Sequence, residues 1–226
     1  MKHENLIEII TNNTTGNRQE LLLDLVTKSK ERFEAAPASG AVRRHHAYDG
    51  GLIDHICEIA EWTLAMAGAT HATLGVAGAP TPQEIVTVAI LHDLNKIGDG
   101  EGNPHYIPNV SEKTGKRSVA EPFSTNKGAH KPASNVPEIS TIIKYAELSC
   151  GELSLTTLSA LSGVLLSDLN ESEINAIRFH DGGYGKAKYA AGYQGKEDRL
   201  VILIHAADML SSRKRNWAVD TTYAAE

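Results

Sequence analysis

The most informative segment of the chain is residues 82–98, Pro-Gln-Glu-Ile-Val-Thr-Val-Ala-Ile-Leu-His-Asp-Leu-Asn-Lys-Ile-Gly. Thr81 as cap, Pro82 at the first helical position and Glu84 three residues after the cap are typical of a helix start. The residues that follow, as far as Leu94, are apolar on nearly every side, so this helix is expected to be buried. The ionisable pair His92-Asp93 interrupts that apolar run and therefore needs polar partners inside the protein.

Helical patterns also fill most of the chain on either side of this segment. A first helix is expected to open at Asn17, with Glu20 as capping partner, and to run to about Glu34. A strong amphipathic stretch follows Gly50-Gly51, and residues 103–121 look like two short strands around a glycine turn. Further helices are expected at about 138–148, 152–167, 171–180 and 198–215, and the one at 171–180 follows an Asn170/Glu173 capping box. The sequence thus predicts an all-α helical bundle with one small β-hairpin at about 103–121.

The length of the chain fits either one large domain or a domain with an appendage. Its 226 residues are ample for a sizeable core. We expect an N-terminal helical extension, 1–34, packed on a core domain, 35–215, and a C-terminal tail, 216–226.

Composition excludes several classes of protein. Hydrophobic residues make up 41% and charged residues 22%, which is too apolar for a disordered chain. The 22 Lys+Arg against 28 Asp+Glu give a formal charge of −6, which argues against non-specific coating of nucleic acid. A small basic pocket remains compatible with that charge.

Nothing in the sequence indicates export or membrane insertion. The N-terminus lacks the features of a signal peptide, and the Ala- and Gly-rich stretch 59–80 is too weakly apolar to form a span. This stretch is expected to be a packed helix that runs into a loop. Cys57 and Cys150 cannot make a disulfide framework, so a reduced, cytoplasmic protein without a membrane partner is expected.

Ionisable residues inside apolar helices are the main functional signal. His55 lies on the stripe that starts at Leu52, His92-Asp93 ends the buried helix, and Asp208 lies on the most hydrophobic helix. Two histidines and two carboxylates that converge from three helices would form a metal site. Each has a simpler interpretation: a buried histidine often bonds a backbone carbonyl, and Asp208 could pair with an arginine.

The same residues resemble the H…HD…D signature of the HD superfamily of metal-dependent phosphohydrolases. His45…Tyr48-Asp-Gly-Gly-Leu-Ile-Asp-His55 is similar to the segment that opens many HD domains, especially in a phage and bacterial group and in the 3′-to-5′ exoribonuclease branch. The motifs at 91–98, 177–183 and 205–210 are similar to later segments of the family. The resemblance covers about residues 35 to 213 and implies the all-α HD fold.

The resemblance implies a divalent metal ion, with one or two ions bound and Mn, Fe, Co, Ni, Zn and Mg all open as its identity. It assigns the ion to His55, His92, Asp93 and Asp208, and a second ion to His180 and Cys150. It gives catalytic roles to Asp93, Lys96 and His180, and substrate contacts to His45 and Lys96. By their charge, Arg43, Arg44, Lys186 and Lys188 could form a rim that contacts an anionic substrate, although surface charges are usually only solvated. His180 is expected either to ligate the second ion or to protonate the leaving oxygen.

Cys150 departs from the family pattern. The chain has Cys-Gly-Glu-Leu-Ser at 150–154, where relatives carry His-Gly-Glu-x-Ser. If Cys150 replaces the histidine that helps to hold a second ion, the site would either lose that ion or favour a softer metal such as zinc. A small buried cysteine that packs at a helix start is an equally simple interpretation.

The expected activity is hydrolysis of a nucleotide or a similar small phosphate ester by a metal-activated water. The first alternative is a 3′-to-5′ exonuclease on single-stranded RNA or DNA. It would need stacking aromatics and a basic track, whereas aromatics are only 5% of the chain. Weaker alternatives are an HD-type iron oxygenase and a nucleotide sensor without turnover. The sequence leaves a homo-oligomer open.

Overall fold

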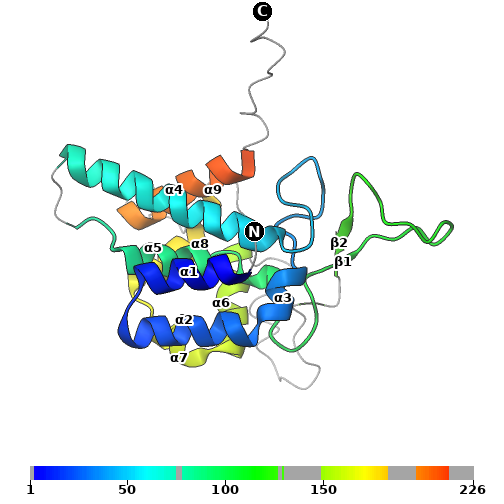
Figure 1. The fold of residues 1–226 in the computed structure, drawn as a ribbon, viewed down its shortest axis with the longest axis horizontal. Helices are drawn as coiled ribbons and strands as arrows, with labels where there is room; N and C mark the ends of the chain where they lie inside the picture. Colours follow the sequence, from blue (N-terminus) through cyan, green and yellow to red (C-terminus); the bar gives the residue numbers. More distant parts are fainter. Residues whose placement is uncertain (1–2, 75–77, 127–128, 130–148, 183–196, 214–226) are drawn as a thin grey trace, which may run out of the picture.

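The computed structural model describes residues 3–74, 78–126, 129, 149–182 and 197–213. Within them the chain is mostly helical, with one two-stranded antiparallel sheet (Figure 1), so an all-α fold with a small hairpin is confirmed. The elements are α1 (His3–Asn13), α2 (Gly16–Lys28), α3 (Lys30–Ala35), α4 (Gly51–Leu74), α5 (Pro82–Leu91), the 3-10 helix η1 (Leu94–Ile97), β1 (Tyr106–Pro108), β2 (Phe123–Thr125), α6 (Cys150–Leu161), α7 (Gly163–Asp168), α8 (Glu171–Phe179) and α9 (Arg199–Arg213). The helix expected at 138–148 and the tail 216–226 lie outside the described residues.

Two helix starts follow their predicted capping signals. The Thr81 hydroxyl accepts the Glu84 amide, and the Glu84 carboxylate accepts the Thr81 amide, so α5 opens with a complete capping box. Asn170 and Glu173 form the same reciprocal pair at the start of α8. Each box supplies acceptors to two backbone N–H groups that the start of a helix would otherwise leave unpaired.

The N-terminal helices differ from the prediction. The helix expected from Asn17 to Glu34 begins at Gly16 without a side-chain cap bond and divides at Ser29, where ψ of 13° leaves the helical region. A further helix, α1, precedes it. Its Leu6 and Ile10 are fully buried in the same core as Leu22 of α2, so these helices share the core with the rest of the chain.

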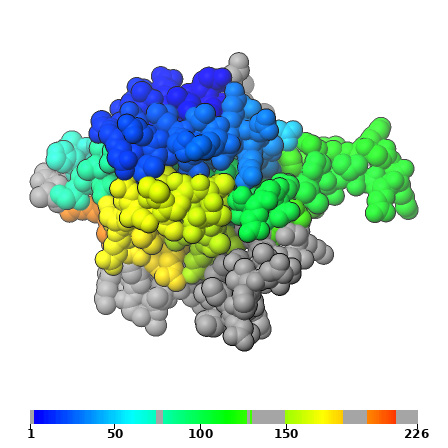
Figure 2. Space-filling model, turned by 90° about the horizontal axis from the view of Figure 1, so that it is seen from below, coloured from blue at the N-terminus to red at the C-terminus, as the bar shows by residue number. Residues whose placement is uncertain are grey.

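Two other predicted boundaries are wrong. The single helix expected at 152–167 is two helices, because the backbone of Ser162 (φ −156°, ψ 78°) is not helical and separates α6 from α7. The hairpin extends beyond 103–121: Ile107 pairs with Ser124, and the expected second strand keeps only the isolated bridge from Val110 to Arg117. The hairpin projects from the helical body in both views (Figures 1 and 2).

The core lies among the five helices that carry or adjoin the candidate ligands, and α1 and α2 also contribute to it. Helix α4 packs against α5 and α9, and α8 packs against α6 and α9. Gly151 permits the close approach of α6 to α8, since a Cβ at this position would lie 2.1 Å from the Ile177 carbonyl oxygen. This packing places Cys150, the first residue of α6, beside the end of α5. No described helix combines the length and the apolarity that crossing a membrane requires.

Candidate metal centre

The structure brings together the four residues expected to hold the first ion. His55 comes from α4, His92 and Asp93 directly follow α5, and Asp208 comes from α9. The Nε2 atoms of His55 and His92 are 3.4 Å apart. The Asp208 Oδ1 lies 3.2 Å from the Nε2 of His55, and the Asp93 Oδ2 lies 3.3 Å from the Nε2 of His92. Both rings are fully buried.

The two imidazoles are oriented by bonds on their other nitrogen. His92 donates from Nδ1 to the Ala89 carbonyl oxygen, 2.8 Å away. His55 donates from Nδ1 to the Ser211 hydroxyl at 2.9 Å, and Ser211 donates in turn to the Glu58 carboxylate at 2.9 Å. Because these bonds occupy Nδ1, neutral rings present their Nε2 lone pairs to the cluster. Such outer hydrogen bonds are typical of histidines that ligate metals.

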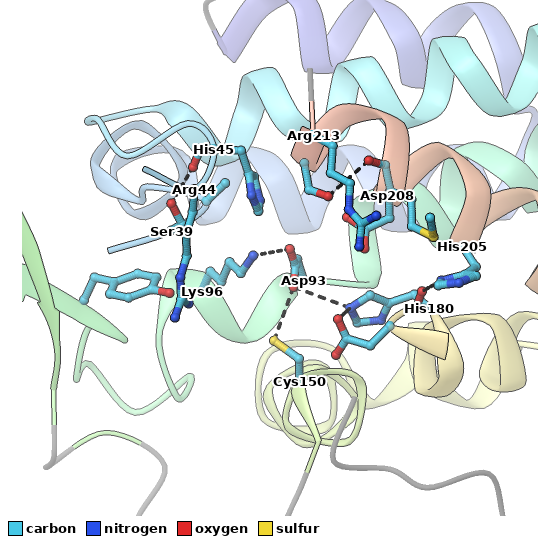
Figure 3. Close-up of a pocket in the computed structure, with 15 residues that line it drawn as sticks. Ser39, Arg44, His45, Asp93, Lys96, Cys150, His180, His205, Asp208 and Arg213 are labelled. Carbon is cyan, nitrogen blue, oxygen red and sulfur yellow. Dashed lines mark hydrogen bonds and ion pairs between the residues drawn. The ribbon is translucent and has the colours of Figure 1, made fainter. Parts of the chain in front are cut away.

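A second group of ligand atoms lies on the other side of Asp93. Figure 3 shows Asp93 between Lys96, Cys150 and His180. The Cys150 Sγ donates to the Asp93 Oδ1 at 3.3 Å, and the His180 Nε2 is 3.8 Å from the same oxygen. His180 is fixed by a 2.7 Å bond from Nδ1 to the Ile177 carbonyl. Asp93 therefore offers one oxygen to each group.

The charges of the cluster depend strongly on one another. Burial favours neutral Asp93, but Lys96 and His92 outweigh it and hold the pKa of Asp93 well below its usual range. Burial lowers the pKa of Lys96, but the carboxylate of Asp93 raises it above its usual value. Asp208 likewise has a lowered pKa, because the hydrogen bond and charge of His55 overcome the effect of burial. The cluster thus holds two ionised carboxylates inside the protein.

Lys96 and Cys150 are also placed by the structure. Lys96 is only 9% exposed and donates to the Asp93 carboxylate, so it is not a solvated lysine at a helix end. Burial, with the nearby Asp93 carboxylate, raises the pKa of the Cys150 thiol well above its usual value. Cys150 is therefore a thiol that donates to Asp93 while no ion is bound.

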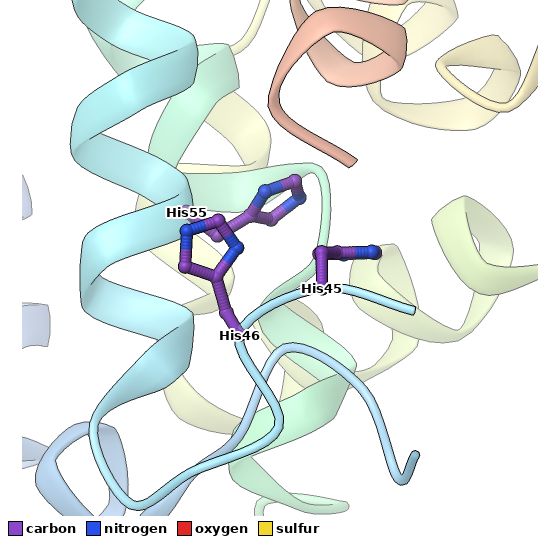
Figure 4. Close-up of side chains that lie close together, drawn as sticks. All are labelled: His45, His46 and His55. Atoms are coloured by element: carbon purple, nitrogen blue, oxygen red, sulfur yellow. The ribbon is translucent and has the colours of Figure 1, made fainter. Parts of the chain in front are cut away.

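Two neighbouring histidines approach His55 from the loop before α4 (Figure 4). The ring centroids of His45 and His55 are 4.6 Å apart. Burial, together with the charges of His55 and Lys96, lowers the pKa of His45 to about 2, and its Nε2 is buried without a hydrogen-bond partner. His46, which the sequence did not single out, adopts φ +44° and bonds Glu58 through Nε2 at 3.3 Å.

A pocket of about 290 Å³ opens over this cluster. Arg44 lines it, whereas Arg43 is 76% exposed and lies 3.8 Å from Glu121 outside the lining. The predicted substrate contact Lys186 lies outside the described residues. The pocket also contains residues that sequence reasoning missed: Ser39, Tyr106, Asp181, His205, Met209 and Ser212.

Two of the missed residues had a local signal. Asp181 directly follows His180, and their side chains lie 3.6 Å apart. His205 is three residues before Asp208 on α9, a spacing that places both on one helix face. It donates from Nδ1 to the His180 carbonyl at 2.6 Å, which holds α9 against the end of α8.

The buried histidine, aspartate and cysteine groups could hold a metal ion. The ligand atoms of His55, His92 and Asp208 lie within 4.8 Å of one another, as do those of Asp93, Cys150 and His180. Comparisons with protein-family models, with curated proteins and with solved structures found no match to this chain. The case for function therefore depends on this geometry and on the sequence motifs.

Proposed function

We propose that this chain is a metal-dependent phosphohydrolase of the HD type that acts on a nucleotide or a similar small phosphate ester. The observation that carries the proposal is the 3.4 Å approach of two imidazole Nε2 atoms whose Nδ1 atoms are already engaged. Burial lowers the pKa of His55, but its hydrogen bonds to Asp208 and Asp93 outweigh this and raise it. A shared cation would replace the proton on His55, and both Nε2 lone pairs would then face it beside the ionised carboxylates.

The residues present fit a divalent ion. His55, His92, Asp93 and Asp208 would hold it, and Asp93, Cys150 and His180 could hold a second. When bound, such an ion would act as a Lewis acid that polarises a phosphoryl oxygen, and it would lower the pKa of a bound water. The Cys150 thiol would have to lose its proton to become a ligand, which favours zinc over magnesium at that position.

The remaining residues of the pocket suit an anionic substrate. The Arg44 guanidinium lines the pocket and has no ion pair among the described residues, so it can meet a phosphate group. The unpaired Nε2 of His45 can hydrogen-bond a phosphate oxygen. Lys96 keeps Asp93 ionised and lies beside the same space, while His180 would either bind the second ion or protonate the leaving oxygen.

The size and lining of the pocket favour a small substrate. About 290 Å³ is near the lower end of the range for ligand pockets. Apart from histidines, Tyr106 is the aromatic residue in its described lining, whereas a nuclease that grips single strands stacks successive bases on several aromatics.

The proposal is tested by incubating the protein and Mn²⁺ with a mixed pool of nucleoside mono- and triphosphates and short oligonucleotides, followed by mass spectrometry of the products. We expect loss of one nucleotide class, intact oligonucleotides, and no reaction after treatment with a chelator. Shortened oligonucleotides beside unchanged nucleotides would instead identify a nuclease. A pool that is unchanged with each of Mn²⁺, Zn²⁺, Co²⁺ and Fe²⁺ would contradict the proposal.

Replacing Ser211 by alanine should weaken metal binding about 10- to 100-fold, the usual effect of losing an outer hydrogen bond to a ligand. The change removes the acceptor of the His55 Nδ1 and the hydrogen bond from Ser211 to the Glu58 Oε2. Titration of the chelator-treated protein with Mn²⁺ measures this affinity. Ser212→Ala is the matched control, and an affinity unchanged in Ser211→Ala would mean that this chain of bonds does not support an ion site.

A further inference from the structure

A second cavity, of about 260 Å³, shares the wall residues Lys96 and Tyr106 with the pocket over the cluster. Its other walls come from helix α3, from the segment that follows α3 and from the loop after η1, and they include Arg32, Pro37 and Pro104. The two cavities are therefore neighbours, and the side chains of Lys96 and Tyr106 lie between them. None of the predicted site residues other than Lys96 lines this second cavity.

Arg32 supplies an unbalanced charge to the second cavity. Its Nη1 is buried without a hydrogen-bond partner, and Arg32 forms no ion pair within the described part of the chain. Glu31 also lines the cavity, but it is exposed and makes no ion pair with Arg32. Buried donors in proteins nearly always have a partner, so an unpaired one that borders a cavity indicates that a ligand supplies the acceptor.

The rest of the lining narrows the chemistry of that ligand. A guanidinium fork matches the oxygens of a phosphate group. The Tyr106 hydroxyl, which is protonated at neutral pH, also lines the cavity and can donate as well. Pro37 and Pro104 contribute no backbone N–H to the wall, and Lys96, which also lines it, already donates to Asp93.

We propose that this cavity is a second anion subsite, which takes a phosphate group with Arg32 as its principal donor. The phosphate either belongs to the molecule bound in the first pocket, as a second phosphate on the same substrate, or is a free phosphate bound beside it. The proposal concerns binding alone and goes beyond the hydrolysis proposed above.

The test is calorimetric titration of inorganic phosphate into chelator-treated protein, in which no turnover can occur. We expect Arg32→Gln to weaken phosphate binding at least about tenfold, because charge-assisted hydrogen bonds are lost. Lys30→Gln removes one positive charge from the exposed side of the same helix and should leave the affinity unchanged. Ala35→Glu places a carboxylate three residues after Arg32 on the same helix, where it can pair with the guanidinium, and should weaken binding similarly.

The proposal would be overturned by no phosphate binding to the wild-type protein or by an unchanged affinity in Arg32→Gln. It would also be overturned by an equal loss in Lys30→Gln, which would show a general effect of charge. Binding that Arg44→Gln removes and Arg32→Gln spares would assign the phosphate to the first pocket and would also overturn it. Since no reaction is involved, failure here is separate from failure of the proposed hydrolase.

Titrations with two nucleotides distinguish the sources of the phosphate. If the phosphate is part of the substrate, a nucleoside 3′,5′-bisphosphate should bind at least about tenfold more tightly than the 5′-monophosphate, and Arg32→Gln should remove that difference. If it is a free ligand, the two nucleotides should bind alike, and inorganic phosphate should still bind to protein saturated with the monophosphate. Either pattern supports the subsite.

Discussion

Replacing Asp93 by asparagine should reduce metal-dependent hydrolysis at least about 100-fold. Loss of an outer hydrogen bond to a metal ligand already lowers metal affinity or activity about 10- to 100-fold, and Asp93 would itself be a ligand. It also lies between the two groups of ligand atoms, with one oxygen near His92 and the other near Cys150 and His180. Its removal should therefore weaken both positions together.

The same substitution should also destabilise the metal-free protein. Lys96 is buried and donates to the Asp93 carboxylate, so Asp93→Asn leaves a buried ammonium group without its counter-charge. Breaking a buried pair in this way costs about 3–5 kcal/mol. A loss of activity in the single variant could therefore reflect unfolding.

A double variant separates the two effects. Asp93→Asn combined with Lys96→Met removes both charges, and we expect it to recover much of the stability of the metal-free protein without recovering activity. Thermal unfolding and Mn²⁺ titration measure the two quantities independently. Asp49→Asn is the same change at an exposed carboxylate and should leave both unchanged. Hydrolysis by the double variant within about tenfold of wild type would contradict the role given to Asp93.

The parts of the fold that could be predicted from sequence are those with local signals. The boxes at Thr81 and Asn170 use residues three apart, and both helices begin where the boxes indicate. The division at Ser162 was missed although it has a local signal, since the Ser162 hydroxyl caps α7 by accepting the Leu165 amide. The start of α2 at Gly16 has no side-chain cap bond. Strand pairing in the hairpin was similarly misplaced, since Ile107 and Ser124 are far apart in sequence.

The candidate site shows the same division. His55, His92 and Asp208 could be singled out because ionisable residues stand out on apolar helix faces, and the structure brings their side chains together. The choice between Arg43 and Arg44 could not be made, because the loop before α4 has no periodic pattern that shows which side chain faces inward. His46 was missed for the same reason. It adopts a positive φ in this loop, and no periodic pattern in the sequence indicates that conformation.

Replacing Arg18 by methionine should lower the free energy of unfolding by about 3–5 kcal/mol, the usual cost of leaving a buried charge without its partner. Arg18 of α2 is only 8% exposed, and its Nε donates to the Asp168 carboxylate at 2.7 Å. Its Nη1 donates to Glu173, which is 1% exposed, and to the Thr87 hydroxyl at 3.2 Å. One guanidinium thus ties α2 to α5, α7 and α8, although its partners lie far along the chain.

The cause of the loss can be isolated with a second change at Glu173. Glu173→Gln keeps an oxygen that can accept the Asn170 amide in the helix cap but removes the buried negative charge. We therefore expect Arg18→Met with Glu173→Gln to be more stable than Arg18→Met alone, as denaturant unfolding followed by circular dichroism would measure. Arg178→Met, which breaks a half-exposed pair with Glu152, should cost only about 1 kcal/mol or less. If Arg18→Met proves no more costly than Arg178→Met, the network does not hold the N-terminal helices on the core.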